Sequence, residues 1–173
     1  ESNGLDSNTI DYFANNDPKL KKDFGTLADE LCDAKEYGSI LNISQVDFAA
    51  LYARVDEVRG DISLFREMVL NDVEPLIRVA EIMAQKYDVV VTNPPYLGSS
   101  RFSGKLSEYI ASNYCDEKSD LAMTMLSKMY YGYVRPNGFV SAITTVSWMY
   151  LKSFEKFRSK VIRTRDFINL VDF

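Results

Sequence analysis

Residues Tyr87-Asp-Val-Val-Val-Thr92, followed directly by Asn93-Pro94-Pro95-Tyr96, carry the strongest structural pattern in the chain. A short run of β-branched residues is typical of a strand that is buried on both faces of a parallel sheet. In open α/β sheets, ligands bind outside the carboxyl ends of the strands. The four residues after this strand are therefore predicted to lie at a ligand-binding edge.

Segments with strand and helix patterns follow this strand. Apolar runs predict two more strands, at 139–144 and 167–171. Apolar residues at helical spacing predict helices over 105–114, 120–134 and 153–162, the last of them capped by Ser153. Strands that alternate with helices favour βαβ units, so the predicted fold class is α/β, with a parallel sheet and flanking helices.

The part before this strand, residues 1–86, is predicted to be a mainly helical segment or insert. Helical spacing over 23–35 ends at Gly38, and 39–43 has the composition of a short strand. A long periodic series from Asp61 to Met83 predicts a helix with Asp61 as its N-cap and a bend or restart at Pro75.

The composition excludes several classes of protein. The 173 residues are 46% hydrophobic, which is enough for one packed domain, and the longest apolar runs are far shorter than the roughly 20 residues that span a membrane. The chain has no histidine, and Cys32 and Cys115 are isolated, so the usual zinc sites and Cys/His nucleophiles are not expected. These features predict a reduced, cytoplasmic, metal-free protein.

The net charge and the first residues point to missing parts. A module that binds DNA by itself usually carries a basic face, whereas this chain has a formal charge of −5. The DNA-binding surface is therefore expected to lie outside this chain. The start, Glu1–Asn8, is polar, does not begin with Met and does not resemble a signal peptide. The chain is therefore predicted to be cut from a longer protein.

The tetrapeptide suits chemistry on a planar amino group. Such an amine is a weak nucleophile because its lone pair is delocalised, and the Asn93 side-chain oxygen and the Pro94 carbonyl can each accept one of its hydrogens. The two prolines restrict the backbone and hold these acceptors in place, and the Tyr96 ring can stack on a base flipped out of a duplex. The alternative is a plain turn, but the preceding strand favours the functional interpretation.

At these residues the chain resembles the amino-methyltransferases, whose fourth motif is (Asn/Asp/Ser)-Pro-Pro-(Tyr/Phe/Trp) after a hydrophobic strand. It is most similar to the gamma-class N6-adenine DNA methyltransferases, in particular the large enzymes of BREX phage defence and of type IIG restriction-modification systems. The similar segments are 33–43, 87–98, 105–107, 118–121 and 137–157.

The resemblance implies that residues 87–173 are the C-terminal half of a Rossmann-like methyltransferase domain, with S-adenosylmethionine as donor and adenine N6 as acceptor. Asn93, Pro94, Pro95 and Tyr96 would then be the catalytic residues. Asp120 and Leu121 match a motif that lines the pocket between donor and base, although an acidic residue there would also suit the start of a helix. Trp148 is a further pocket candidate, although a lone Trp is more often a core residue.

Two parts of the family pattern are not found. The donor-binding stretch (Asp/Asn)-Pro-x-x-Gly-x-Gly is missing, since residues 16–19 lack any following glycine, and it is expected to precede Glu1. No target-recognition domain is present either. The resemblance thus implies a parent enzyme that binds DNA, with possible restriction or defence subunits as partners, and an isolated chain that is inactive.

Two alternatives remain open. The same motif serves enzymes that methylate a protein glutamine amide or an RNA base amine, although those are usually smaller and lack the long helical segment over 61–85. The chain could also be a non-catalytic helical interaction module, in which the sheet is only a support and Asn93 has lost its role.

Overall fold

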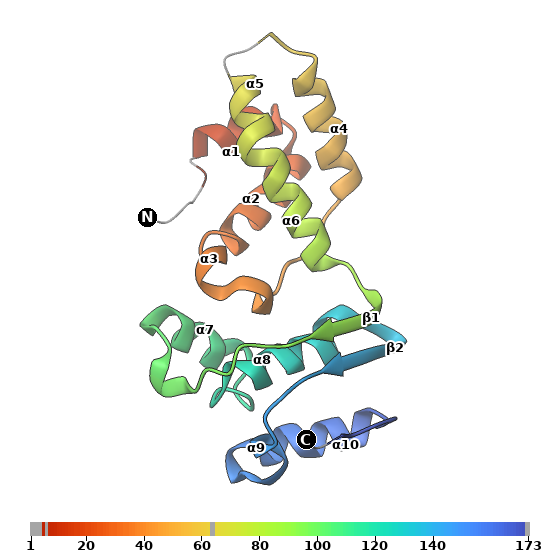
Figure 1. Ribbon diagram of the computed structural model, residues 1–173. Coiled ribbons are helices and arrows are strands. Elements are labelled where there is room, and N and C mark those ends of the chain that lie inside the picture. The colour runs from red at the N-terminus through yellow and green to blue at the C-terminus, as the bar shows by residue number, and fades with distance from the viewer. Residues whose placement is uncertain (1–4, 6, 63–64, 172–173) are drawn as a thin grey trace. The chain divides into compact units, whose positions relative to one another are not determined.

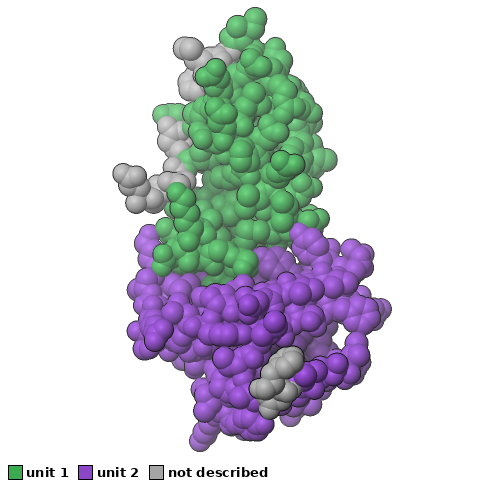
Figure 2. Space-filling model, in the orientation of Figure 1, with its two compact units in different colours: residues 1–85 green, residues 86–173 purple. Residues whose placement is uncertain are grey.

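The computed structural model describes residues 5, 7–62 and 65–171. The chain divides into two compact units, Glu1–Gln85 and Lys86–Phe173 (Figure 2).

Every regular element described in the first unit is a helix or a helical turn (Figure 1). Its elements are α1 (Ser7–Ala14), α2 (Pro18–Glu30), α3 (Ala34–Tyr37), η1 (Gly38–Ile40), α4 (Phe48–Arg59), α5 (Phe65–Met68), η2 (Val69–Val73) and α6 (Glu74–Ala84). The ring centroids of Phe13 in α1 and Phe24 in α2 lie 4.6 Å apart, so the two helices pack together at these residues. The predicted helical segment before the sheet is confirmed.

Several details of this unit differ from the sequence prediction. The strand at 39–43 is wrong, because Ile40 and Leu41 are both buried and residues 38–40 form a 3-10 turn, whereas the side chains of a strand point alternately to opposite faces. The helix predicted at 23–35 begins earlier, at Pro18, because Asp17 caps it by accepting hydrogen bonds from the amides of Lys19 and Leu20. It ends at Glu30, before the short α3.

The long helix predicted from Asp61 is partly confirmed. A π-helical turn at Val69–Val73 directly precedes α6, whose first turn contains Pro75, as expected for a restart at proline. Ile62 is fully exposed, so its predicted place on the buried face is wrong. Asp61, the predicted N-cap, lies outside any helix, and its Oδ1 accepts a hydrogen bond from the neighbouring Ile62 amide at 2.8 Å, whereas α5 begins at Phe65, so this cap is wrong. The residues that join Ile62 to α5 lie outside the described ones. Helix α4, capped by Asp47, was not predicted.

The second unit is built around two parallel strands, β1 (Tyr87–Thr92) and β2 (Val134–Ala142). Between them lie η3 (Ser99–Arg101), α7 (Gly104–Asn113), α8 (Leu121–Ser127) and the π-helical η4 (Lys128–Tyr133), and after them come α9 (Ser147–Tyr150), η5 (Lys152–Phe154) and α10 (Glu155–Thr164). This βαβ crossover confirms the α/β fold class, as part of a Rossmann-like domain. The predicted helices at 105–114, 120–134 and 153–162 correspond to α7, α8 with η4, and α10.

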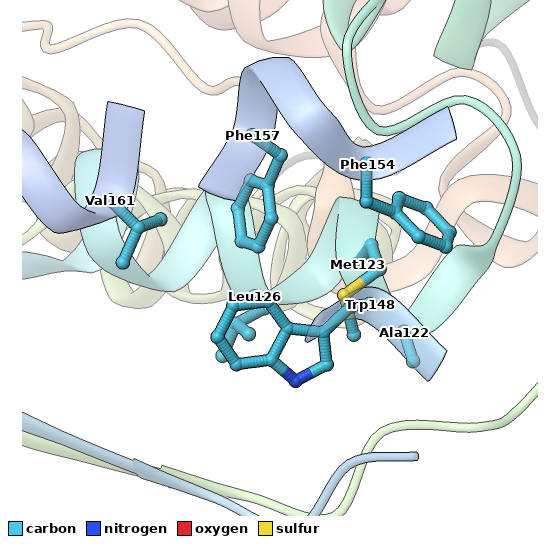
Figure 3. Packing of buried hydrophobic residues seen from close by; sticks show 7 residues of the cluster. All are labelled: Ala122, Met123, Leu126, Trp148, Phe154, Phe157 and Val161. Carbon is cyan, nitrogen blue, oxygen red and sulfur yellow. The ribbon is translucent and has the colours of Figure 1, made fainter. Parts of the chain in front are cut away.

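A hydrophobic cluster packs against one face of β2. It consists of seven buried residues from α8, α9, η5 and α10, namely Ala122, Met123, Leu126, Trp148, Phe154, Phe157 and Val161 (Figure 3). Val140 and Ala142 of β2 pack against this cluster. Residues on the other face, Val89, Val91 and Phe139, are more than half exposed, so burial of β1 on both faces is wrong within the described chain.

Two predictions near the C-terminus are also wrong. Ser153 does not cap α10, because it lies inside η5 and the helix begins at Glu155 without a side-chain cap. Residues 167–171 form no strand in the described structure. Phe167 instead stacks on Trp148, with 6.4 Å between ring centroids. A strand needs a partner whose backbone groups it can pair with, and its own composition does not supply one.

The pairing of the two strands is interrupted near the start of β2. Tyr87 pairs with Val134 and Val89 with Phe139, so residues 135–138 form an irregularity, with Asn137 at a φ of 64°. A Cβ atom on Gly138 would lie only 2.7 Å from the Asp88 carbonyl oxygen. Glycine at this position allows the chain to return to the β1 edge.

Gly138→Ala is expected to destabilise the protein by about 1–3 kcal/mol, because the Asp88 backbone must move to admit the methyl group. The measurement is the free energy of unfolding from urea titration. Gly104→Ala is the matched control, since nothing lies within 4 Å of a Cβ built there. Equal stability of the two variants would contradict the close approach.

Candidate active site

The carboxyl ends of β1 and β2 bring the predicted motif next to Ile143. Thr92 pairs with Ala142, and the Ile143 amide donates to the Thr92 carbonyl at 3.1 Å. The Tyr96 hydroxyl then lies 3.1 Å from the Ile143 carbonyl oxygen and 3.4 Å from Asn93 Oδ1. The tetrapeptide is thus held against the end of the neighbouring strand.

The Tyr96 hydroxyl has a single proton to donate. The Ile143 carbonyl oxygen is the nearer of its two acceptors, so this proton is better shared with Ile143 than with Asn93. Asn93 Oδ1 therefore keeps accepting capacity for a substrate. Asn93 is exposed, Pro94 is buried and Tyr96 is 48% exposed. Pro94 is thus packed inside the protein, while Asn93 and Tyr96 remain accessible to a substrate.

The chain after Tyr96 is paired with the segment that starts α8. The Leu121 amide donates to the Leu97 carbonyl at 2.9 Å, and the Ser99 amide donates to the Ser119 carbonyl at 3.0 Å. Gly98 and Asp120 form an antiparallel bridge. The structure therefore brings Asp120 and Leu121 to the residues that immediately follow the tetrapeptide, as expected if both belong to one site.

Asp120 has a defined structural role at the start of α8. Its Oδ1 accepts a hydrogen bond from the Ala122 amide at 2.8 Å, which makes it the N-cap. Burial raises the pKa of the Asp120 carboxyl, and backbone hydrogen bonds from Ala122 and Met123 lower it in part. The helix-start interpretation of Asp120 is thus seen directly, and its place in a pocket stays a prediction.

Trp148 lies in the hydrophobic cluster and is only 8% exposed. Its ring meets Phe157 edge to face, with 6.0 Å between centroids, and its Nε1 donates to Thr144 Oγ1 at 3.1 Å. Arg158 donates to the Trp148 carbonyl at 2.6 Å. Trp148 is therefore a core residue, joined through Thr144 to the end of β2.

Two contacts near these residues were not predicted from the sequence. The Ile143 carbonyl anchors Tyr96, and no sequence signal identifies a main-chain acceptor that becomes a neighbour only through strand pairing. Glu117 is a buried acid that accepts a hydrogen bond from Ser127 Oγ at 2.8 Å. The acid and the serine are ten residues apart, and nothing in their spacing indicated the contact.

Neither membrane-spanning helices nor clusters of metal ligands were found in the described part of the chain. In residues 16–19, the stretch compared with the donor motif, Asp17 is the N-cap of α2 and Pro18 and Lys19 lie in its first turn, so these residues form no glycine-rich loop.

Comparison with known proteins identifies the family. The model of the Eco57I restriction-modification methylase family matches residues 13–173, so the chain belongs to this family. The chain is 35% identical over 142 residues to the adenine-specific methyltransferase BrxX of Escherichia coli O9:H4 (strain HS), which covers 79% of this chain and 12% of the relative. It is 34% identical over 86 residues to the adenine-specific methyltransferase PglX of Lacticaseibacillus casei (strain Zhang), covering 50% of this chain and 7% of the relative.

The chain thus spans about an eighth of the length of BrxX and less of PglX. Membership of a methylase family implies a methyl donor of the S-adenosylmethionine type.

Glu117→Gln is expected to stabilise the protein near pH 7. Burial raises the pKa of the Glu117 carboxyl, so the folded state favours the protonated acid, and stability is lost as the pH rises from the unfolded value through the folded one. Glutamine keeps an acceptor for Ser127 without this charge.

The measurement is the melting temperature of wild type and Glu117→Gln at several pH values. The variant should melt higher at pH 7, and the difference should shrink as the pH falls below the unfolded pKa of about 4.3. A difference that does not change with pH would contradict the assignment of a buried, proton-binding acid. Glu108→Gln, on the exposed side of α7, is the matched control.

Proposed function

We propose that the full-length protein is an adenine-N6 DNA methyltransferase that acts in restriction-modification or phage defence. Its substrate would be an adenine flipped out of the duplex, and its donor S-adenosylmethionine. The family match, the names of the two relatives and the arrangement of Asn93 and Tyr96 support this proposal. The observation that carries it is the hydrogen bond from the Tyr96 hydroxyl to the Ile143 carbonyl, because it holds the motif at the carboxyl ends of the strands, where open α/β sheets bind their ligands.

The proposed role of Asn93 and Pro94 is to accept the two hydrogens of the adenine amino group. Hydrogen bonds to Asn93 Oδ1 and to the Pro94 carbonyl favour a tetrahedral nitrogen, whose lone pair is then directed at an electrophile rather than into the ring. The donor supplies a methyl group on a sulfonium ion. The nitrogen lone pair forms the new N–C bond, the C–S electron pair leaves with sulfur, and the extra amino proton is lost to solvent.

Tyr96 is proposed to hold the base by stacking. Its hydroxyl is fixed on Ile143, and about half of its surface is open. A stacked base recovers part of the energy that is lost when it leaves the duplex, on the order of 1–3 kcal/mol. The described residues thus supply the acceptor side of the reaction, and we infer no donor contact for residues 16–19, which are committed to a helix cap.

Asn93→Ala in the full-length protein is expected to reduce methyl transfer by at least about a hundredfold while leaving DNA affinity nearly unchanged, because the lost acceptor acts on the nitrogen as charge develops. The measurement is N6-methyldeoxyadenosine in DNA, by mass spectrometry, together with DNA binding. Asn169→Ala is the matched control, since Asn169 is exposed and outside any helix or strand.

Turnover of Asn93→Ala close to wild type would contradict the role given to Asn93. Methylated RNA or protein glutamine, with no methylated DNA, would replace the DNA enzyme by the enzymatic alternative. No methylation of any of the three by the wild type would favour a non-catalytic module.

Tyr96→Ala should lose more activity than Tyr96→Phe, because phenylalanine keeps the stacking ring and loses only the bond to Ile143. For a loss of 1–3 kcal/mol, kcat/KM should fall by roughly 5- to 150-fold in Tyr96→Ala. The measurement is kcat/KM on a DNA substrate that contains the target adenine. If Tyr96→Phe were as impaired as Tyr96→Ala, the hydroxyl rather than the ring would carry the role.

A further inference from the structure

The charge of the chain is divided unevenly between its two units. Residues 1–85 carry 8 Lys and Arg against 17 Asp and Glu, a formal charge of −9, whereas residues 86–173 carry 12 against 8, a formal charge of +4. The overall charge of −5 is therefore the sum of an acidic first unit and a basic second unit, and the second unit contains the candidate active site. The sequence-based expectation that the DNA-binding surface lies outside this chain used the total charge and did not consider the charges of the two units separately.

Four of these basic residues form a row along α10 and the turn before it. Lys156, Lys160 and Arg163 follow at i, i+4 and i+7, so they lie on one side of the helix, and Lys152 precedes them by four residues. All four are exposed. We call Lys152, Lys156, Lys160 and Arg163 the α10 basic row.

The rest of α10 is anchored to the core of the second unit. Phe157 and Val161 are buried in the hydrophobic cluster. In Figure 3 their side chains extend from α10 toward the part of the cluster that contains Leu126 and Trp148. Val140 and Ala142 of β2 pack on the same cluster, and Ile143 follows directly. The basic row is therefore fixed, through the cluster, to the strand that anchors Tyr96.

The groups around the row leave much of its charge uncompensated. Lys156 Nζ lies 3.7 Å from Asp116 Oδ1, a long and exposed ion pair of a kind that contributes little. Lys160 Nζ lies over the Tyr131 ring at 4.0 Å from its centroid, and the Glu117 carboxyl near Lys160 is buried. Glu155 and Asp166 are the other acids close by in the sequence.

We propose that the α10 basic row contacts the phosphate backbone of the DNA substrate. This inference rests on the proposed function and assigns part of the DNA contact to this chain. Lys156 to Arg163 span about 10 Å along the helix, and each strand of duplex DNA carries one phosphate per roughly 3.4 Å of its axis, so about three phosphates of one strand match the length of the row. Cations on a fixed helix suit contacts that position a duplex without reading its sequence.

An anionic membrane surface is the other polyanion that a basic helix could meet. A helix that binds such a surface inserts its apolar face among the lipids. The apolar residues Phe157 and Val161 of α10 are already committed to the hydrophobic cluster. The geometry therefore favours DNA.

The test compares the 173-residue chain with two triple variants that each remove three positive charges. One is Lys156→Gln/Lys160→Gln/Arg163→Gln, in the row, and the matched control is Lys21→Gln/Lys22→Gln/Lys35→Gln, at exposed positions of the first unit. Fluorescence anisotropy with a labelled duplex oligonucleotide gives the affinity between 50 and 200 mM salt, concentrations at which phosphate contacts dominate. Circular dichroism verifies that both variants remain folded.

The row variant should bind at least about tenfold more weakly, and its slope of log affinity against log salt should be shallower by about 2.7, which corresponds to three lost contacts. The control should retain the wild-type slope. A double Lys156→Arg/Lys160→Arg variant keeps the charge and should bind like wild type, which separates charge from a change in packing.

Equal slopes for the row variant and the control would overturn the inference, as would a wild-type chain with no affinity for the duplex. So would a loss of binding to phosphatidylserine vesicles without any loss on DNA. None of these results would affect the proposed methyl transfer, which is judged by N6-methyldeoxyadenosine in DNA.

Discussion

Parallel hydrogen bonding between β1 and β2 places Thr92 beside Ala142, although the two residues are far apart in the sequence. Ile143 follows directly after this pair. The Ile143 amide continues the pairing by donating to Thr92, and its carbonyl accepts from the Tyr96 hydroxyl. One residue thus extends the ladder and anchors the motif. If the two strands slipped by one residue, Ile143 would no longer face Tyr96, and the motif would lose this anchor.

The sequence identified the main elements of the second unit because their signals are local. The Val89–Val91 run and the helical spacing in α8 and α10 each indicated an element without knowledge of its neighbours, and the second strand was found with its bounds displaced, predicted at 139–144 and observed as Val134–Ala142. The errors fall where tertiary contacts decide. Residues 167–171 have the composition of a strand, but in this structure Phe167 packs on Trp148 instead.

The candidate site shows the same limit. Asn93 and Tyr96 were identified from their own pattern, and Asp120 and Leu121 from a resemblance, but the pairing of Leu97 with Leu121 that brings these residues near one another is a backbone contact that depends on the fold. The acidic total charge was equally uninformative, because the basic residues lie mainly after Gln85 and the acidic ones mainly before it. A chain of this kind can be acidic overall and still contain a basic unit.

The two proposals together divide the tasks within the second unit: the strand ends would hold the reacting amine, and α10 would hold the backbone of the same DNA. The most decisive measurement is an experimental structure of the full-length protein with a donor analogue and DNA that contains the target adenine. The adenine amino nitrogen should lie about 3 Å from both Asn93 Oδ1 and the Pro94 carbonyl oxygen, with the base against the Tyr96 ring and the Tyr96 hydroxyl still on Ile143. An adenine bound elsewhere, or an amino nitrogen more than about 4 Å from both oxygens, would contradict the proposed site.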